Sequence, residues 1–185
     1  MCFAYDQFVA LRSQDIVVLL KLALMGEKRP PYLTIAQELH MYPSEVYTSI
    51  KRARESQLVQ GPELNDRLNR SALLEFLVHG VRYSFPPKRG AITRGLPTAY
   101  AAPPLKDKID SGEDVPPVWP YSQGQTRGYS FSPLHKNAPQ AALEDSRLYE
   151  LLALVDAIRD GRARERSAAI QELERRIEKP AYAKS

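Results

Sequence analysis

The chain has 185 residues, a formal net charge of +4 and 43% hydrophobic residues, enough for a substantial core. Its single cysteine, Cys2, excludes an intramolecular disulfide and suits a reducing cytoplasm. The start has no basic leader before an apolar core, and Lys21 interrupts the longest apolar run, so we expect a cytoplasmic protein with neither signal peptide nor membrane span.

The first predicted element is a helix from Ser13 to Met25 that ends at Gly26. Its apolar residues fall on nearly all sides of the helix, which is typical of a helix buried in a core. After a loop, Tyr32 and Leu33 predict a short strand.

Residues 34–58 predict two helices joined by a tight turn. Apolar residues recur at helical spacing before and after an interruption at Met41 to Ser44. Pro43 and Ser44 are typical of a helix start, where the serine hydroxyl can cap free amides. The outward side of the second helix then carries residue types that contact bases and phosphates in a DNA major groove: Ser44, Glu45, Tyr47, Thr48, Lys51, Arg52 and Arg54. A plain helical hairpin inside a larger core is the alternative.

This pattern resembles the helix-turn-helix of winged-helix bacterial regulators, broadly MarR-like, over residues 12–60. The resemblance rests on Ala36, Leu39, Val46, Ile50 and Ala53, with Leu58 and Val59 opening a strand. It implies a homodimer that binds double-stranded DNA. The family usually has glycine where this chain has His40, so either the turn is wider or His40 adopts a left-handed backbone conformation.

Beyond a Gly-Pro pair, residues 65–78 predict an amphipathic helix, and residues 81–85 alternate as a half-buried strand does. The turn after this strand predicts a displaced wing, with a return strand near residues 91–93. The wing presents three cations to the DNA backbone: Lys88, Arg89 and Arg94. The alternative is an ordinary basic surface loop.

Residues 86–139 contain ten of the fifteen prolines, which excludes long helices there. Trp119, Tyr129, Phe131 and a low charge density are unlike a solvated linker. We therefore expect an extended segment whose aromatic side chains pack on this chain or its dimer mate, with a foreign partner protein as the alternative.

Residues 144–177 return to helix, with one apolar stripe up to Gly161 and a narrower one after it. Alternating charges along both helices predict ion pairs on a solvent face. We interpret these helices as a dimerisation or partner-binding element. The alternative is a helical cap on the same domain.

The expected fold is mainly α with a small β element. It comprises a winged helix-turn-helix domain (1–94), an extended Pro-rich and aromatic segment (95–140) and C-terminal helices (141–185). Residues 12–94 hold thirteen Lys and Arg against eight Asp and Glu, whereas both charge signs balance in 95–140 and in 141–185. The positive excess thus lies in the predicted DNA-binding domain, as attraction to phosphate requires.

Catalysis finds little support in the sequence. His40, His79 and His135 lack the spacing of metal ligands, and no glycine-rich phosphate loop lies between a strand and a helix. Asp156 and Asp160 share a helix face and are expected on the surface. We therefore predict no enzymatic activity, cofactor or metal.

Two functions follow from this organisation. The first is a sequence-specific DNA-binding transcriptional regulator that acts as a homodimer. The alternative is an antitoxin or adaptor of a bacterial two-gene system, which binds a partner protein through the Pro-rich segment and the C-terminal helices.

Overall fold

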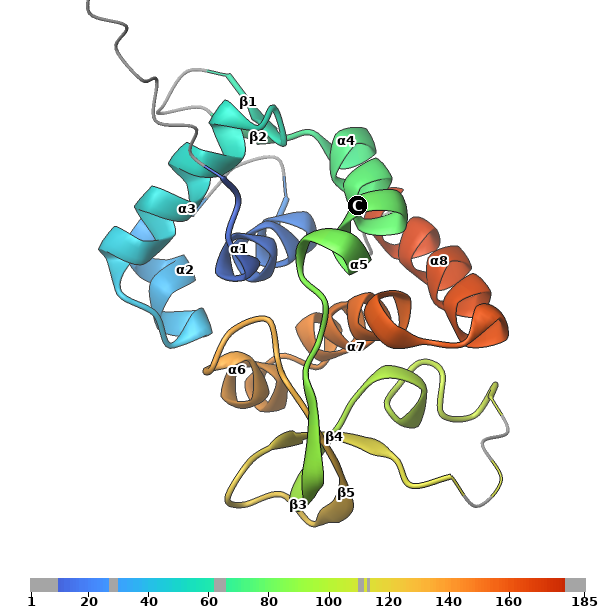
Figure 1. Cartoon of the computed structure of the whole chain (residues 1–185). Helices are drawn as coiled ribbons and strands as arrows, with labels where there is room; N and C mark the ends of the chain where they lie inside the picture. The colour runs from blue at the N-terminus through green and yellow to red at the C-terminus, as the bar shows by residue number, and fades with distance from the viewer. Residues whose placement is uncertain (1–9, 27–29, 62–65, 110–111, 113, 179–185) are drawn as a thin grey trace, which may run out of the picture.

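Helix α1 (Ser13–Leu24) packs against helices from both ends of the chain in the computed structural model, which describes residues 10–26, 30–61, 66–109, 112 and 114–178 (Figure 1). The helix begins where the Asp15 carboxylate accepts a hydrogen bond from the Arg12 amide (2.8 Å). All residues from Asp15 to Ala23 are buried, so the prediction of a helix enclosed on most sides is confirmed. Cys2 lies outside the described residues.

Helices α2 (Tyr32–Leu39) and α3 (Pro43–Glu55) follow, and the predicted strand at Tyr32 and Leu33 is wrong. Tyr32 is half-buried and lies three residues before Ile35 and four before Ala36. It therefore belongs to the same helix face as Ile35, Ala36 and Leu39. The helix therefore begins directly after Pro31.

Two short strands, β1 (Val59–Gln60) and β2 (Arg67–Leu68), pair antiparallel after α3. The helix predicted over 65–78 begins later, as α4 (Arg70–Glu75), where the Asn69 side chain accepts a hydrogen bond from the Ala72 amide (3.2 Å). It continues through a π-helical turn, η1 (Phe76–Gly80), into α5 (Val81–Ser84).

The strand predicted over residues 81–85 is wrong, because this stretch is helical. Val81 is buried and Phe85 is half-buried, but Tyr83 between them is 76% exposed. The apolar period here is therefore four residues, and the Phe85 amide donates to the Val81 carbonyl (2.9 Å) as in a helix.

The Pro-rich segment folds back on its own chain as a small closed sheet of three strands: β3 (Arg89–Pro97), β4 (Pro117–Pro120) and β5 (Thr126–Phe131). Strand β3 is antiparallel to β4 and to β5, which run parallel to each other. A 3₁₀ turn, η2 (Ala99–Ala101), follows β3. Trp119 and Phe131 are buried, so these aromatic side chains pack within the same chain.

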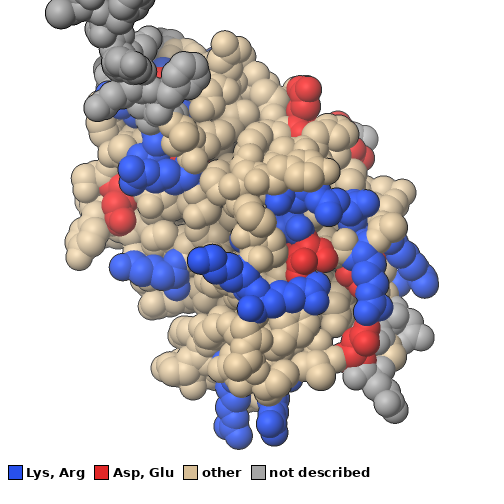
Figure 2. Space-filling view, in the orientation of Figure 1, with Lys and Arg blue, Asp and Glu red and all other residues tan. Residues whose placement is uncertain are grey.

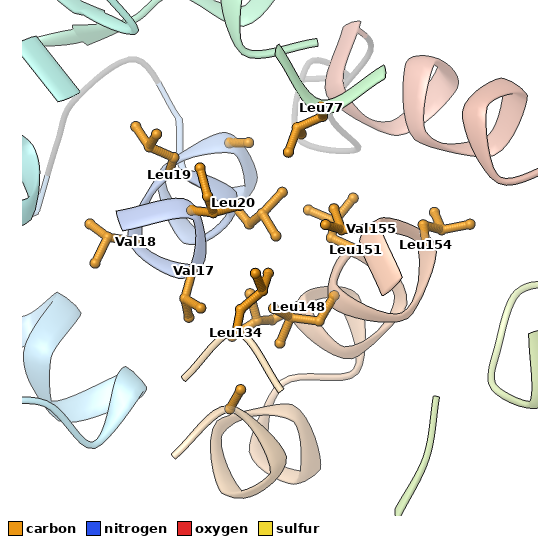
Figure 3. Packing of buried hydrophobic residues seen from close by; sticks show 14 of the residues in the cluster. Val17, Val18, Leu19, Leu20, Leu77, Leu134, Leu148, Leu151, Leu154 and Val155 are labelled. Carbon is orange, nitrogen blue, oxygen red and sulfur yellow. The ribbon is translucent and has the colours of Figure 1, made fainter. Parts of the chain in front are cut away.

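Helices α6 (Ala138–Glu144), α7 (Ser146–Asp160) and α8 (Ala163–Glu178) complete the fold. Side chains of α7, among them Leu148 and Leu151, point toward Val17 and Leu20 of α1 (Figure 3). One buried cluster takes residues from all three predicted segments. The C-terminal helices therefore pack into the same core as α1 to α3. This arrangement matches the alternative in which they form a helical cap on the same domain.

A buried carboxylate joins the sheet to the helices. Asp156 of α7 is 1% exposed, so the expectation that it lies on the surface is wrong. Its Oδ2 accepts hydrogen bonds from Thr98 Oγ1 (2.8 Å) and Trp119 Nε1 (2.7 Å), and its Oδ1 lies 2.6 Å from Arg159 Nη1. The Arg159 Nε also donates to the Phe85 carbonyl (2.8 Å). These contacts come from β4, from α7, from the residue before η2 and from the residue after α5, so they fix how the sheet sits on α7.

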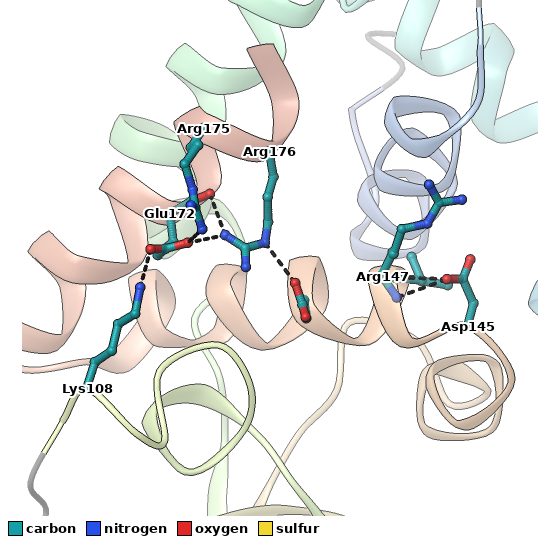
Figure 4. Close-up of polar contacts among 8 residues, drawn as sticks. Lys108, Asp145, Arg147, Glu172, Arg175 and Arg176 are labelled. Carbon is teal, nitrogen blue, oxygen red and sulfur yellow. Dashed lines mark hydrogen bonds and ion pairs between the residues drawn. The ribbon is translucent and has the colours of Figure 1, made fainter. Parts of the chain in front are cut away.

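Helix α8 is attached through a second polar cluster, shown in Figure 4. The Glu172 carboxylate accepts hydrogen bonds from Lys108, Arg175 and Arg176, and Arg176 Nε also donates to Glu150 of α7 (2.8 Å). Burial raises the pKa of Glu172, but these hydrogen bonds outweigh it and hold the pKa at about 2.

Candidate nucleic-acid interface

His40 forms the turn between α2 and α3 in the left-handed conformation, with φ 53° and ψ 41°. The Met41 amide donates to the Ala36 carbonyl (2.9 Å), which closes α2 and redirects the chain toward α3. Asn137 donates to the His40 carbonyl, and His40 Nε2 lies 2.9 Å from Glu144 Oε1. Of the two options for this position, a wider turn or a left-handed residue, the left-handed residue is confirmed. The contacts from Asn137 and Glu144 stabilise His40 in this conformation.

Helix α3 begins with Pro43 as its first residue and Tyr42 as its N-cap. The Glu45 carboxylate accepts a hydrogen bond from the Tyr42 amide (2.8 Å), so Glu45 provides the cap that we had expected from Ser44. Thr48 Oγ1 donates to the Ser44 carbonyl (2.7 Å), which positions the Thr48 side chain along the helix surface.

A row of four side chains lies on the outward face of α3, at the spacing i, i+3, i+4 and i+7: Ser44, Tyr47, Thr48 and Lys51, all exposed. The opposite face holds buried Val46, Ser49, Ile50 and Ala53. Tyr47 is 42% exposed and makes an edge contact with the Tyr32 ring (centroids 5.7 Å apart). The structure thus brings these four predicted residues together on one open helix face.

Arg52 does not belong to this face, so the prediction that its side chain points outward from α3 is wrong. It is 4% exposed, and its Nε and Nη2 donate to the two oxygens of Asp15 on α1 at 2.7 and 2.5 Å. Arg54 is half-buried and bonds Asp66 at 2.5 Å. Both arginines join α3 to its neighbours, because a carboxylate that is distant in sequence lies beside each of them.

Few charges therefore remain on the outward side of α3. Within α3, all of whose residues the structure describes, Lys51 is the only exposed Lys or Arg, and Glu55 is exposed as well. Figure 2 shows isolated basic and acidic groups over α3, whereas Lys and Arg form a band across the middle of the same view. Arg12 before α1 and Arg67 on β2 are further exposed cations.

The β1–β2 hairpin stands directly after α3, where a winged helix has its wing. Val59 pairs with Leu68 and Gln60 with Arg67. The sequence did carry a signal for it, because Gly61 and Pro62 directly follow the short apolar stretch at Leu58 and Val59, and a Gly-Pro pair is typical of a turn. We had instead assigned the residues after this turn to a helix.

Of the cations of the predicted displaced wing, Arg89 and Arg94 lie on β3, and Lys88 directly precedes this strand. Arg89 opens β3, its Nε bonds Asp160 of α7 (2.5 Å), and its guanidinium stacks over the Tyr129 ring at 5.0 Å. Lys88 and Arg94 are exposed. Residues 91–93, where we expected a return strand, belong to β3 itself, and the strand paired with it is β5. Figure 1 draws the β3 arrow at the lower end of the molecule, whereas α3 lies at its upper left.

A hollow of about 180 Å³ lies between the sheet and the α7–α8 turn. Its charged walls are Arg89 with Asp160, Arg162 with Asp114, and Glu165, so its cations are already paired. Burial raises the pKa of Tyr129 in this wall to about 12, which keeps the phenol protonated. Among the residues that the structure describes, no three His, Cys, Asp or Glu side chains are grouped to hold a metal ion.

Comparison of the chain with protein-family models, curated proteins and solved structures found no match. None of the helices in the described ranges combines the length and apolar character that crossing a bilayer requires.

Proposed function

We propose that the protein is a sequence-specific DNA-binding regulator of transcription that acts as a homodimer in the cytoplasm. In this proposal α3 enters the major groove of double-stranded DNA, and the β1–β2 hairpin serves as the wing of a MarR-like winged helix. The observation that carries the proposal is the exposed row of Ser44, Tyr47, Thr48 and Lys51 on α3.

These four side chains suit base and phosphate contacts. Hydroxyl groups of Ser44 and Tyr47 can both donate and accept hydrogen bonds, and Lys51 donates to base acceptors or phosphate. The Thr48 hydroxyl donates to the Ser44 carbonyl, so at DNA it acts as an acceptor. The helix is held in place from behind by the Arg52–Asp15 pair, so the row keeps its orientation when it meets a rigid duplex. A single exposed lysine on α3 means that hydrogen bonds supply more of the specificity than charge does.

The adaptor or antitoxin function has weaker support. Trp119 and Phe131, which would contact a foreign partner only under the alternative interpretation of the Pro-rich segment, are buried within the chain. What favours a protein partner is the exposure of large apolar side chains around α2 and α3: Leu33 at 56%, Tyr42 at 74% and Tyr47 at 42%. A protein bound there would compete with DNA for the same helix face.

Selection from a library of random duplexes tests the proposal. The wild type should enrich a defined sequence, and mass measurement in solution should give a dimer on two half-sites. Lys51→Ala and Thr48→Ala should then weaken binding to that sequence by about 1–3 kcal/mol for each true base contact, with a smaller effect on unrelated DNA. Arg164→Ala, which removes an exposed cation on α8, is the matched control. No enrichment, or equal losses on selected and unrelated DNA, would remove the sequence-reading role.

A further inference from the structure

The sheet is built from a part of the chain that contains no acidic residues. Residues 76–106 hold five Lys and Arg, residues 115–143 hold two, and neither stretch has an Asp or Glu. These stretches contain β3, β4 and β5 entirely. By contrast, residues 12–60, with the helix-turn-helix, hold seven basic and five acidic residues. The strands of the sheet therefore carry basic side chains and no acidic ones.

The pairing of β3 with β5 places two arginines side by side. Arg94 is directly opposite Arg127, and Ile92 is directly opposite Tyr129. Residues opposite each other in an antiparallel pair point to the same face, as do residues two apart on one strand. All four side chains therefore share one face of a two-stranded ribbon, which we call the β3–β5 ribbon.

The other face of this ribbon is closed, and that closure directs the arginines outward. A Cβ on Gly95 would lie 2.0 Å from the Trp119 carbonyl oxygen, and one on Gly128 would lie 2.1 Å from that of Pro116. The backbone around β4 thus crosses so near that only glycine fits on this side. Arg94 and Arg127, each next to one of these glycines, are exposed.

Neither arginine has a carboxylate partner among the described residues, whereas Arg89 at the other end of β3 pairs with Asp160. Like charges directly opposite each other destabilise a strand pair. In Figure 2, basic groups project from the lower end of the molecule, where Figure 1 draws the sheet, without acidic groups beside them. An anion that contacts both guanidinium groups would remove this repulsion.

We propose that the β3–β5 ribbon is a second nucleic-acid contact, in which Arg94 and Arg127 each bind a phosphate of the duplex backbone. The choice of DNA as the polyanion rests on the proposed function, but none of the α3 residues takes part. Two guanidinium groups on adjacent strands suit a backbone with regularly spaced phosphates, and exposed Ile92 beside them offers no base-edge hydrogen bond. The contact is therefore independent of sequence.

The salt dependence of DNA binding tests the ribbon. In Arg94→Gln/Arg127→Gln, the slope of log affinity against log salt should fall by about 1.8, since each phosphate contact contributes about 0.9. Between 50 and 200 mM salt, the wild type should then lose about tenfold more affinity than the variant, on selected and unrelated duplexes alike. Arg94→Lys/Arg127→Lys should keep the slope. Arg147→Gln/Arg164→Gln, which removes two exposed cations from α7 and α8, should keep it too.

The possible outcomes separate the two proposals. If the glutamine variant, shown to be folded by its urea transition, keeps the wild-type slope, the ribbon proposal is wrong, while losses in the α3 variants still support the regulator. If the ribbon variant lowers the slope but Lys51→Ala and Thr48→Ala leave the DNA affinity unchanged, the ribbon proposal is supported and the regulator proposal is wrong. Binding to phosphatidylserine vesicles but to no duplex, lost in the glutamine variant, would overturn the assignment to nucleic acid.

Discussion

Replacing Arg52 by methionine distinguishes a structural arginine from a DNA-reading one. The substitution keeps an unbranched apolar side chain that reaches about as far as the arginine Nε, but it removes both bonds to Asp15. The Asp15 carboxylate is 0% exposed, and among the described residues it then retains only the Arg12 amide as a hydrogen-bond donor. Breaking a buried ion pair from one side costs about 3–5 kcal/mol. For a chain of 185 residues the unfolding entropy is about 0.4 kcal/mol/K, so Tm should fall by about 8–13 °C.

Urea unfolding followed by far-ultraviolet circular dichroism measures this loss, with DNA titrations at a temperature where the variant is folded. Arg52→Lys should lie between the wild type and Arg52→Met, because lysine keeps the charge but not the two-pronged geometry. Asp15→Asn/Arg52→Met should recover much of the loss, since no uncompensated charge stays buried. A stability of Arg52→Met within about 1 kcal/mol of the wild type, together with lost DNA affinity, would refute the structural role.

Three further predictions concern single positions. Glu172, whose pKa is about 2 in the folded chain against 4.5 ordinarily, stabilises the fold above pH 4.5, and this contribution is lost as the pH falls toward 2. Glu172→Gln should therefore lower the urea midpoint at pH 7 and flatten its acid dependence; an unchanged pH profile would contradict this. Gly128→Ala should cost about 1–3 kcal/mol or more by calorimetry, because its Cβ would lie 2.1 Å from a carbonyl oxygen, whereas Gly90→Ala, with 3.2 Å to its nearest neighbour, is the milder control. His40→Gly should stabilise by up to about 1 kcal/mol and His40→Val should destabilise, given the left-handed backbone there; a large loss in the glycine variant would show that the His40 ring matters more.

The elements that could be predicted are those whose signal is local. An apolar residue on every side of a helix, as over 16–23, predicts burial without reference to any partner. The spacing of Val46, Ile50 and Ala53 predicts which side of α3 faces inward, and therefore that Ser44, Tyr47, Thr48 and Lys51 face outward. At His40 the sequence left two options, a wider turn or a left-handed residue, and the structure shows the second.

Short patterns were ambiguous where two periods fit the same residues. Val81 and Phe85 suit both an alternating strand and a helical turn, and only the exposure of Tyr83 decides between them. Each strand of the β1–β2 hairpin is too short for its composition to predict it. The two strands are recognised only from their pairing in the structure.

By itself, then, the sequence determined the helix-turn-helix spacing, the buried first helix and the exclusion of long helices from the Pro-rich stretch. Tertiary structure alone decided which charges are available at the surface. Arg52 is buried because Asp15, 37 residues away, lies beside it, and Asp156 is buried because Thr98 and Trp119 converge on it from the sheet. Arg94 and Arg127 share a face only through strand pairing, 33 residues apart along the chain. The free energy of a charge depends on the partners and solvent around it, and these are set by the fold rather than by neighbouring residues.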